Sequence, residues 1–312
     1  MTPPLHARQQ PIRPPVDPQG LADDVRHLPL NAHLISLGSF DVFMASAAQL
    51  PNVLPEIGRL REIAFRDVGE GTGTACDTDT YDLHYQHLFV WNRVGCDVVG
   101  AYRLGFTHDI IRQQGMSGLY THSLFDFDAA LFDRLGPSLE LGRSFVSPAY
   151  QGNTRALRLL WAGIAMVLER HPDLAHLFGP VSVSPRFSEL GRMLIMSALQ
   201  LHHMDAALKP LIRARNAPLR AGHPWQERVT EVSAGLADAG RLSRFLQRLE
   251  QGLALPMLIK HYIELKGRFA GFNVDQAFNN TLDGLVFVRV QDIPAKMRAR
   301  LTGRPEAHIP RA

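Results

Sequence analysis

Alternating and periodic apolar positions along the chain predict a succession of strands and helices. Short segments rich in apolar and β-branched residues predict strands over 40–46, 87–93, 97–104, 139–147, 176–184 and 284–290. Apolar residues at helical spacing predict helices over 54–68, 155–170, 187–202, 225–250 and 256–269, with Thr154 as the N-cap of the second. Adjacent hairpin strands exclude a purely parallel sheet, whereas the later strand–helix–strand order requires crossovers. We therefore expect the α/β class, with a mixed sheet covered by helices on both faces.

The remaining segments predict how the chain is organised. Residues 1–33 are rich in proline and polar residues, and we expect a disordered arm there, since proline removes backbone donors. Residues 34–312 form a single domain in this interpretation. It contains a loop over 105–137 with one short helix and a basic, helical insertion over 205–270. A strand over 283–290 then returns to the sheet.

Composition narrows the class of protein and its expected location. The 312 residues are 46% apolar and 20% charged, enough apolar material for a sizeable core. Two cysteines cannot form a disulfide framework, and no apolar run is long enough for a transmembrane helix. The first residues contain no apolar h-region, so we expect no secretory signal. We expect a cytoplasmic protein, with the inner face of the membrane as an alternative location.

The charge is concentrated in one stretch. Residues 205–228 hold five basic residues against two acidic ones, a balance of +3 that equals the net charge of the whole chain. Such a patch suits an acidic partner, either an acidic protein or a membrane surface, and we expect no nucleic-acid partner. The alternative is a solvated, arginine-rich loop. The candidate docking residues are Lys209, Arg213, Arg215 and Arg220.

Several familiar chemistries are absent from the sequence. No P-loop and no Gly-x-Ser-x-Gly nucleophile motif occurs. Asp77, Asp79 and Asp82 superficially resemble a calcium loop, but glycine is missing at the sixth position and Leu88 stands where the twelfth-position Glu belongs. No histidine has an aspartate five positions later, as O-acyltransferases require, and we expect no metal site.

Charged residues inside predicted strands are the strongest chemical signal. Arg103 ends one strand, and Glu140 and Arg143 lie within another, where burial is costly unless the charge is paired or faces a ligand. Strict alternation would put Glu140 and Arg143 on opposite faces, but a bulge near Gly142 would bring both to one cleft. A structural Arg103–Glu140 ion pair is the alternative. The upstream acids Asp79 and Asp82 are open to interpretation as caps or loop acids.

Together these segments resemble a known family. DTDTYDLHYQHLFV (77–90), VVGAYRL (98–104), LELGRSFVSPAYQ (139–151), LLWAGIAM (159–166) and LFGPVSVS (177–184) are similar to the ornithine-lipid type of N-acyltransferase. This branch of the GNAT superfamily, often labelled as hemolysins, is related to acyl-homoserine-lactone synthases. The resemblance covers residues 40–205 and resumes in FNVDQAFNNTLDGLVFV (272–288). It implies a GNAT-like acyl-CoA N-acyltransferase fold with extra C-terminal helices.

The resemblance also implies a reaction and site residues. A fatty acyl group, in the family often 3-hydroxylated, would move from acyl carrier protein to the α-amine of an amino acid, ornithine first. Glu140 matches the general base, Arg103 and Arg143 the paired arginines, and Asp79 and Asp82 the upstream acids, with Ser144 as a further substrate-binding candidate. The acyl donor would be carried on the carrier protein's phosphopantetheine, with no other cofactor.

One departure from the superfamily pattern bears on the donor. Typical acetyltransferases follow this strand with Arg/Gln-x-x-Gly-x-Gly/Ala, whose amides bind the coenzyme A pyrophosphate. Here SPAYQGNTRAL (147–157) has Gly152 alone, which favours a carrier-protein donor and leaves acyl-coenzyme A as an alternative. Glycine, another amino acid or a homoserine-lactone-type signal is the alternative product class, and a non-catalytic acyl-binding protein the most distant one.

Overall fold

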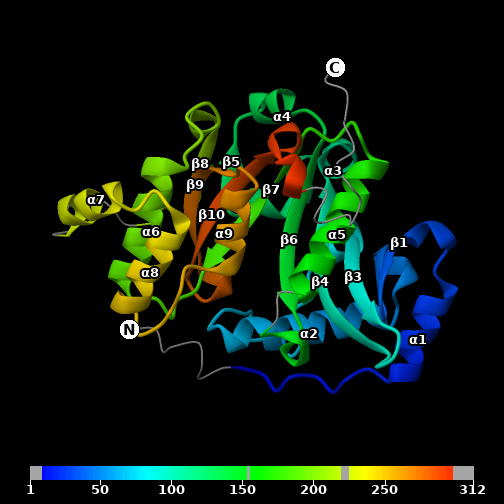
Figure 1. The fold of residues 1–312 in the computed structure, drawn as a ribbon. Coiled ribbons are helices and arrows are strands. Elements are labelled where there is room, and N and C mark those ends of the chain that lie inside the picture. The colour runs from blue at the N-terminus through cyan, green and yellow to red at the C-terminus, as the bar shows by residue number, and fades with distance from the viewer. Residues whose placement is uncertain (1–8, 153–154, 219–224, 298–312) are drawn as a thin grey trace. The chain divides into compact units, whose positions relative to one another are not determined.

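The computed structural model describes residues 9–152, 155–218 and 225–297, which form strands and helices in two units (Figure 1). Unit 1 comprises residues 1–118, 139–174 and 294–312, and unit 2 comprises residues 119–138 and 175–293. The predicted α/β class is confirmed. The prediction of one domain from residue 34 onward stays a prediction.

Five strands form the sheet of unit 1, each antiparallel to the next. In sheet order they are β1 (His33–Leu37), β2 (Phe40–Ser46), β3 (Gln86–Asn92), β4 (Asp97–Phe106) and β6 (Ser138–Val146). The four strands predicted for this region are confirmed, β2 to the residue. The edge strand β1 was not predicted.

Two helices cover opposite faces of this sheet. Helix α2 (Val53–Asp67) packs Ile57 and Leu60 into a core with Phe43 and Phe89. Alternate strand residues point the other way, toward α5 (Arg155–Arg170). There Gly163 permits a close approach, because a Cβ atom at this position would lie 2.6 Å from Val42. The predicted N-cap Thr154 lies outside the described residues.

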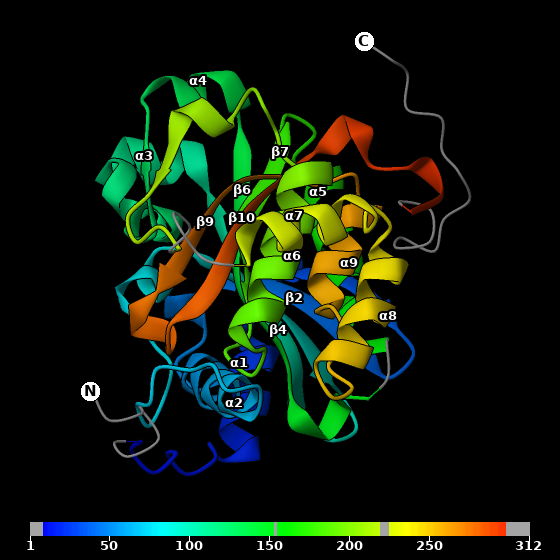
Figure 2. The ribbon, with the colours of Figure 1, turned by 90° about the vertical axis from the view of Figure 1, so that its left-hand side faces the viewer.

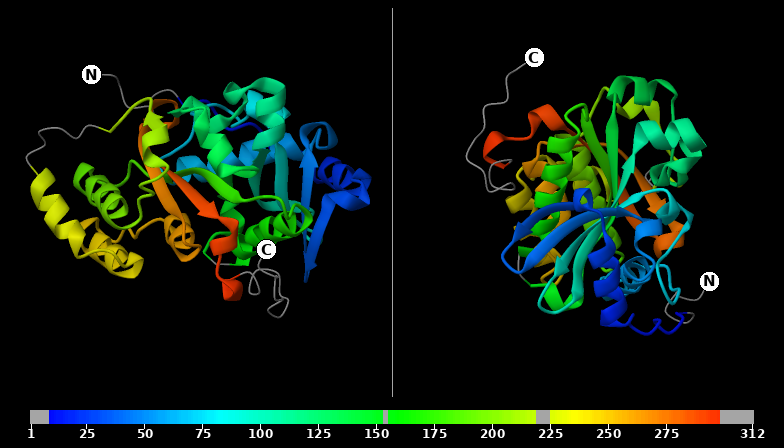
Figure 3. Two further views of the ribbon diagram at one scale, coloured as in Figure 1. Left: turned by 90° about the horizontal axis from the view of Figure 1, so that it is seen from above. Right: turned by 90° about the vertical axis from the view of Figure 1, so that its right-hand side faces the viewer.

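The expected disordered arm over 1–33 is wrong for its second half. Residues 18–27 form helix α1, which lies beside β1 and β2 (Figure 3). Asp17 caps it by accepting from the amide of Gln19, and Pro18 occupies the first turn, where a missing N–H costs nothing. Leu21 is buried against the α2 core, and the buried Asp24 accepts from the amide of Val53. Proline marked the start of a helix here.

The main sheet of unit 2 is a three-stranded antiparallel ladder. Its order is β7 (His176–Val183), β10 (Thr281–Arg289) and β9 (Arg268–Asp275). Strands were predicted over 176–184 and 284–290, and both are confirmed. The helix predicted to run to residue 269 ends at Glu264, because Lys266 adopts a left-handed backbone (φ 66°) and Gly267 follows. Strand β9 begins there instead.

A second small ladder corrects two loop predictions. β5 (Phe125–Phe127) pairs antiparallel with β8 (Ile212–Ala214), so the predicted loop and the predicted basic linker each contain a strand. The expected loop over 105–137 also holds two helices rather than one, α3 (Thr107–Gln114) and α4 (Ala130–Leu135).

Four helices of unit 2 lie near one another, as Figure 2 shows. They are α6 (Glu189–His202), α7 (Gln226–Ala234), α8 (Ala239–Leu249) and α9 (Met257–Glu264). The single helix predicted over 225–250 is two, because α7 stops at Gly235 and Asp238 caps α8 by accepting from the amide of Arg241. Across the described ranges, no helix has the length and apolar character needed to cross a membrane.

Candidate active site

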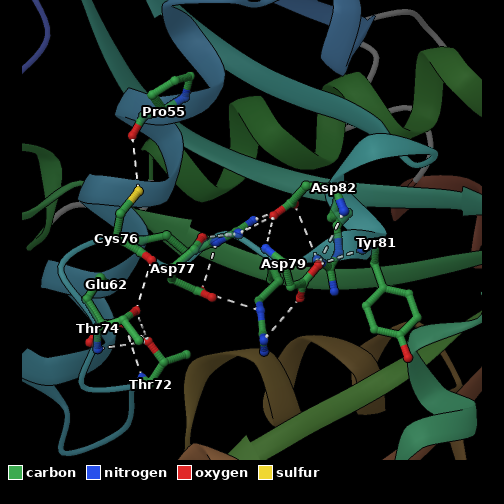
Figure 4. A network of polar contacts seen from close by, with 12 residues as sticks. Pro55, Glu62, Thr72, Thr74, Cys76, Asp77, Asp79, Tyr81 and Asp82 are labelled. Atoms are coloured by element: carbon green, nitrogen blue, oxygen red, sulfur yellow. Dashed lines mark hydrogen bonds and ion pairs between the residues drawn. The ribbon is translucent and has the colours of Figure 1, made fainter.

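A loop after α2 supplies three acidic residues to one cluster in unit 1. Figure 4 shows Asp77, Asp79 and Asp82 close together along this loop. Asp79 caps the 3-10 helix Thr80–Leu83 by accepting from the amides of Tyr81 and Asp82. Asp82 returns a contact, since its Oδ2 accepts from the amide of Asp79 at 2.9 Å. The interpretation of Asp79 and Asp82 as capping acids is therefore confirmed, and their role in substrate binding stays a prediction.

A guanidinium from α2 holds this loop against the sheet. Nε of Arg61 lies 2.9 Å from Oδ2 of Asp77, and its Nη2 lies 2.9 Å from Oδ2 of Asp82. All three side chains are buried. The sequence carried a signal for Arg61 that we missed. It lies four residues after Ile57 and three before Ala64, so it falls on the apolar stripe of α2.

Arg103 from β4 joins the same cluster. Its Nη1 lies 2.5 Å from Oδ1 of Asp79 and 3.3 Å from Oδ1 of Asp82, with only 1% of the side chain exposed. Burial and the neighbouring Arg143 would lower the pKa of Arg103, but the two carboxylates outweigh them and raise it. Its guanidinium also lies over the ring of Tyr85, 5.2 Å from the centroid.

The same charges act on the two aspartates. Burial alone would raise the pKa of Asp79, but Arg103 outweighs it and the pKa is lowered. Burial also opposes ionisation of Asp82, and here Arg61 and Arg103 lower its pKa far below the usual range. Both side chains are therefore carboxylates at neutral pH.

The bulge predicted near Gly142 is present in β6. Ala101 pairs with Phe145 and Arg103 with Gly142, so β6 has one residue more than β4 across this interval. Arg143 sits in the bulge with φ 49°, a left-handed backbone. Its side chain thereby reaches Asp77 at 3.4 Å and Asp79 at 3.5 Å.

The bulge leaves Arg143 more accessible than the other two arginines. Its side chain is 11% exposed, against 1% for Arg61 and for Arg103. Ser144 follows it, half-buried, and makes no side-chain hydrogen bond among the described residues.

Glu140 lies two residues before Gly142 and is fully buried. It accepts a hydrogen bond from the hydroxyl of Tyr85, a residue just before β3. The ring of Tyr85 reaches this position over Gly105, where a Cβ atom would lie 2.5 Å from it. Tyr85 was not a sequence candidate, and only its place inside the matched segment DTDTYDLHYQHLFV could have marked it. One chain of contacts therefore joins Glu140, Tyr85, Arg103, Asp79 and Arg143.

A buried histidine completes the packing around the loop. His87 pairs across the sheet with Arg103 and donates from Nε2 to the carbonyl oxygen of Asp82 at 2.9 Å. Burial lowers the pKa of His87 to about 4, so the imidazole is neutral at physiological pH. It fixes the backbone of the acidic turn without adding charge.

A cavity of about 340 Å³ lies at this end of β3 and β4 in unit 1. Its lining includes His84, Gln86, Leu104 and residues of α3. The ring of His84 packs against Tyr85, with centroids 5.1 Å apart. The cavity therefore extends to His84, which packs against Tyr85, and Tyr85 is the hydrogen-bond donor to Glu140.

The predicted docking residues lie in unit 2 and are partly neutralised. Arg213 and Arg215 both pair with Asp126, at 2.8 Å and 3.0 Å, while Lys209 is exposed. Arg220 lies outside the described residues. Within the described ranges, no group of His, Cys, Asp or Glu side chains is arranged to hold a metal ion.

A known family model matches the part of the chain that holds this cluster. Residues 60–162 match the family described as "Acetyltransferase (GNAT) domain", and this range holds every member of the Glu140–Arg143 chain of contacts and Arg61. A glycine N(alpha)-acyltransferase of Phocaeicola vulgatus is 29% identical over 279 residues, 83% of each chain. Another from Bacteroides thetaiotaomicron is 37% identical over 188 residues, 55% of this chain and 56% of that protein.

Solved structures of acyl-homoserine-lactone synthases are also similar to this chain. The acyl-homoserine-lactone synthase LasI has a TM-score of 0.34 at 16% identity, covering 56% of this chain and 86% of LasI. The CoA-dependent synthase MesI has a TM-score of 0.39 at 11% identity, covering 85% of this chain and 97% of MesI. With the domain match and the two named relatives, the protein is an acyltransferase that carries a GNAT-type domain over residues 60–162.

Proposed function

We propose that the protein transfers a fatty acyl group from a thioester to the α-amine of glycine. The carrying observation is the chain of contacts that holds Glu140, Arg103 and Arg143 together around the bulge of β6. Two relatives named as glycine N(alpha)-acyltransferases support the acceptor. Glycine is one of the acceptors that the sequence left open as an alternative to ornithine.

Each group has a role in this reaction. The amine nitrogen attacks the thioester carbonyl, the C–N bond forms, and the C–S bond breaks to release a thiol. The α-amine is mostly protonated at pH 7, so Glu140 takes the proton of the α-ammonium as attack proceeds. Arg143, the most exposed of the three guanidiniums, binds the acceptor carboxylate. Arg103 is a positioning residue, since it is buried beneath Tyr85 and the acidic loop.

Charge balance in the cluster favours glycine over ornithine. Asp77, Asp79 and Asp82 already pair with Arg61, Arg103 and Arg143. An ornithine side chain brings a second ammonium, and the proposed acid for it, Asp82, is 2% exposed and held by two arginines. Glycine has no such group to place. Ornithine remains the second candidate because of the family resemblance, with Asp79, 25% exposed, as the acid that could meet its side chain.

We infer acyl carrier protein as the donor, with coenzyme A as the alternative. After β6 the chain makes a 3-10 turn at Pro148–Tyr150 and reaches Gly152 with φ 90°. This segment supplies one small residue where a pyrophosphate-binding loop of typical acetyltransferases has two. A donor that is held by a carrier protein does not need a second small residue in this loop to bind the pyrophosphate of coenzyme A.

The experiment offers purified protein an acyl thioester on carrier protein or on coenzyme A, with glycine, ornithine or leucine as acceptor. Mass spectrometry identifies the amide, and thiol release gives the rate. We expect N-acylglycine as the main product, formed faster from the carrier protein. N-acylornithine as the main product would overturn the acceptor, and no amide with any acceptor would overturn the reaction.

A further inference from the structure

Helix α8 of unit 2 is basic and strongly amphipathic. Its sequence, AGRLSRFLQRL, contains three arginines and no acidic residue. Leu242, Ser243 and Leu246 are buried, which fixes the inward face. The outward face consists of Arg241, Arg244, Phe245, Gln247, Arg248 and Leu249, all exposed.

The outward face divides into an apolar stripe and a basic stripe. Phe245 and Leu249 are four residues apart and therefore lie one above the other, with 38% and 40% of each residue exposed. Arg241, Arg244 and Arg248 occupy the adjoining strip, farther from the buried face, by the 100° advance per residue. Arginine thus borders exposed phenylalanine and leucine along the whole helix.

These three arginines carry unbalanced charge. None of them has an ion pair within the part of the chain that the structure describes. The acids at the two ends of α8 are engaged elsewhere, because Asp238 caps the helix and Glu250 accepts from the hydroxyl of Ser188. The predicted docking segment differs in this respect, since Arg213 and Arg215 share Asp126.

Large apolar side chains are also exposed on the neighbouring helices. Trp225 at the start of α7 is 51% exposed, Val232 is 42% exposed, and Met257 at the start of α9 is 55% exposed. Together with Phe245 and Leu249, they are five of the twelve exposed large apolar residues of the described chain, within residues 225–257. Isolated exposed apolar residues are ordinary, but five in this short stretch of sequence single out this part of unit 2 as the place to look for an interaction surface.

We infer that α8 binds the surface of an anionic bilayer. Phe245 and Leu249 insert at the level of the headgroups, while Arg241, Arg244 and Arg248 bind their phosphates. Helices that lie in a membrane interface combine these features, arginine or lysine on one face beside Phe, Leu or Trp. A second copy of the chain fits poorly, because two such basic faces repel each other. The exposed aromatic and aliphatic side chains favour a bilayer over a purely acidic protein partner.

Membrane binding by α8 does not depend on which amine accepts the acyl group, but its use to the enzyme rests on the proposed function. An N-acyl amino acid is an amphiphile that leaves the enzyme most readily into a bilayer. Peripheral binding would release the product where it accumulates. The sequence predicted a membrane or carrier-protein contact in 208–222, and that remains a prediction. Leu208 in that segment is buried and unable to insert.

The test measures co-sedimentation of the full chain with vesicles of phosphatidylcholine alone or with phosphatidylglycerol. The variant is Arg241→Ser/Arg244→Ser/Arg248→Ser, and the matched control is Lys209→Ser/Arg213→Ser/Arg215→Ser, which removes the same formal charge. We expect the α8 variant to lose about a hundredfold in affinity for anionic vesicles, roughly fivefold per arginine, and the control to lose much less. High salt should weaken wild-type binding.

Two further measurements separate insertion from charge alone. Trp225 is the exposed member of the three tryptophans, since Trp91 and Trp161 are buried, so a blue shift of fluorescence on anionic vesicles reports contact near α7. Phe245→Ser/Leu249→Ser, checked by thermal melting, should also weaken binding. The inference is overturned if wild-type protein does not bind anionic vesicles. It is equally overturned if the α8 triple variant and the Lys209/Arg213/Arg215 control lose the same affinity for these vesicles. It is also overturned if the α8 triple loses only carrier-protein binding. Acyl transfer to glycine in vesicle-free solution should be unchanged in the α8 triple, which separates this surface from the reaction.

Discussion

Asp82→Asn removes one charge from the cluster and keeps the shape of the side chain. In the wild type, the carboxylate lies 2.9 Å from Nη2 of Arg61 and 3.3 Å from Nη1 of Arg103, and it also accepts from the amide of Asp79. The substitution leaves two guanidiniums facing a neutral amide in a buried setting. We therefore expect an effect on folding before any effect on substrate recognition.

The size of the effect follows from burial. Removing one partner of a buried ion pair costs about 3–5 kcal/mol, because the remaining charge stays desolvated. Asp82 is buried together with both of its arginines, so this range applies rather than the small value of surface pairs. The control is Asp126→Asn, which also removes an arginine-paired carboxylate but at an exposed position, where we expect little change.

The pH dependence has a defined sign. Because the folded-state pKa of Asp82 is lowered from 3.8, its contribution is complete above that value and is lost as the pH falls through the folded pKa. Urea unfolding at pH 7 should show the full loss in Asp82→Asn. The difference between wild type and variant should shrink as both are acidified below pH 3.8.

One result would refute this reasoning. If Asp82→Asn were as stable as wild type at pH 7 and raised the KM for ornithine far more than for glycine, Asp82 would be an acceptor-binding residue. The structural account instead predicts a large loss of stability and equal changes in KM for the two acceptors.

Two further predictions concern the neighbours of the cluster. Tyr85→Phe should lower kcat about tenfold, because it removes the hydrogen bond from the hydroxyl of Tyr85 to Glu140. The control Tyr150→Phe removes a hydroxyl bonded to Asp97 and should leave kcat unchanged. Equal losses of kcat in the two variants would contradict the role of Tyr85. His87 is neutral when folded, with a pKa of about 4 against 6.5 unfolded, so it stabilises above pH 6.5 and loses this as the pH falls toward 4. Thermal melting of His87→Gln, which keeps a donor, should lack that acid-dependent loss, and an unchanged dependence would assign it to other groups.

The sequence predicted those features that local pattern determines. Alternation placed β2 to the residue, and helical spacing placed α5 over 155–170. The bulge near Gly142 was predictable, because Glu140 and Arg143 can face the same side of the sheet only if a bulge interrupts the alternation between them. By contrast, β5 and β8 are three-residue strands that exist only through pairing with each other across 87 residues, a contact with no local pattern.

The site was predictable in part for the same reason. Glu140, Arg103 and Arg143 are conspicuous as charges inside apolar strands. Tyr85 is not conspicuous, since a tyrosine beside a strand is ordinary until the fold carries its hydroxyl to Glu140. Pairing of Asp82 with Arg61 joins residues 21 positions apart, and only the packing of α2 on the sheet brings them together.

The central claim is that Glu140 accepts the proton of the attacking amine, and Glu140→Gln tests it most directly. The glutamine keeps an acceptor for Tyr85, so thermal melting should be close to wild type. With an acyl carrier protein thioester and glycine at pH 7, we expect kcat to fall about a hundredfold or more. The deficit should narrow at higher pH, where the amine loses its proton unaided. A variant that transfers the acyl group at nearly the wild-type rate at pH 7 would contradict the account.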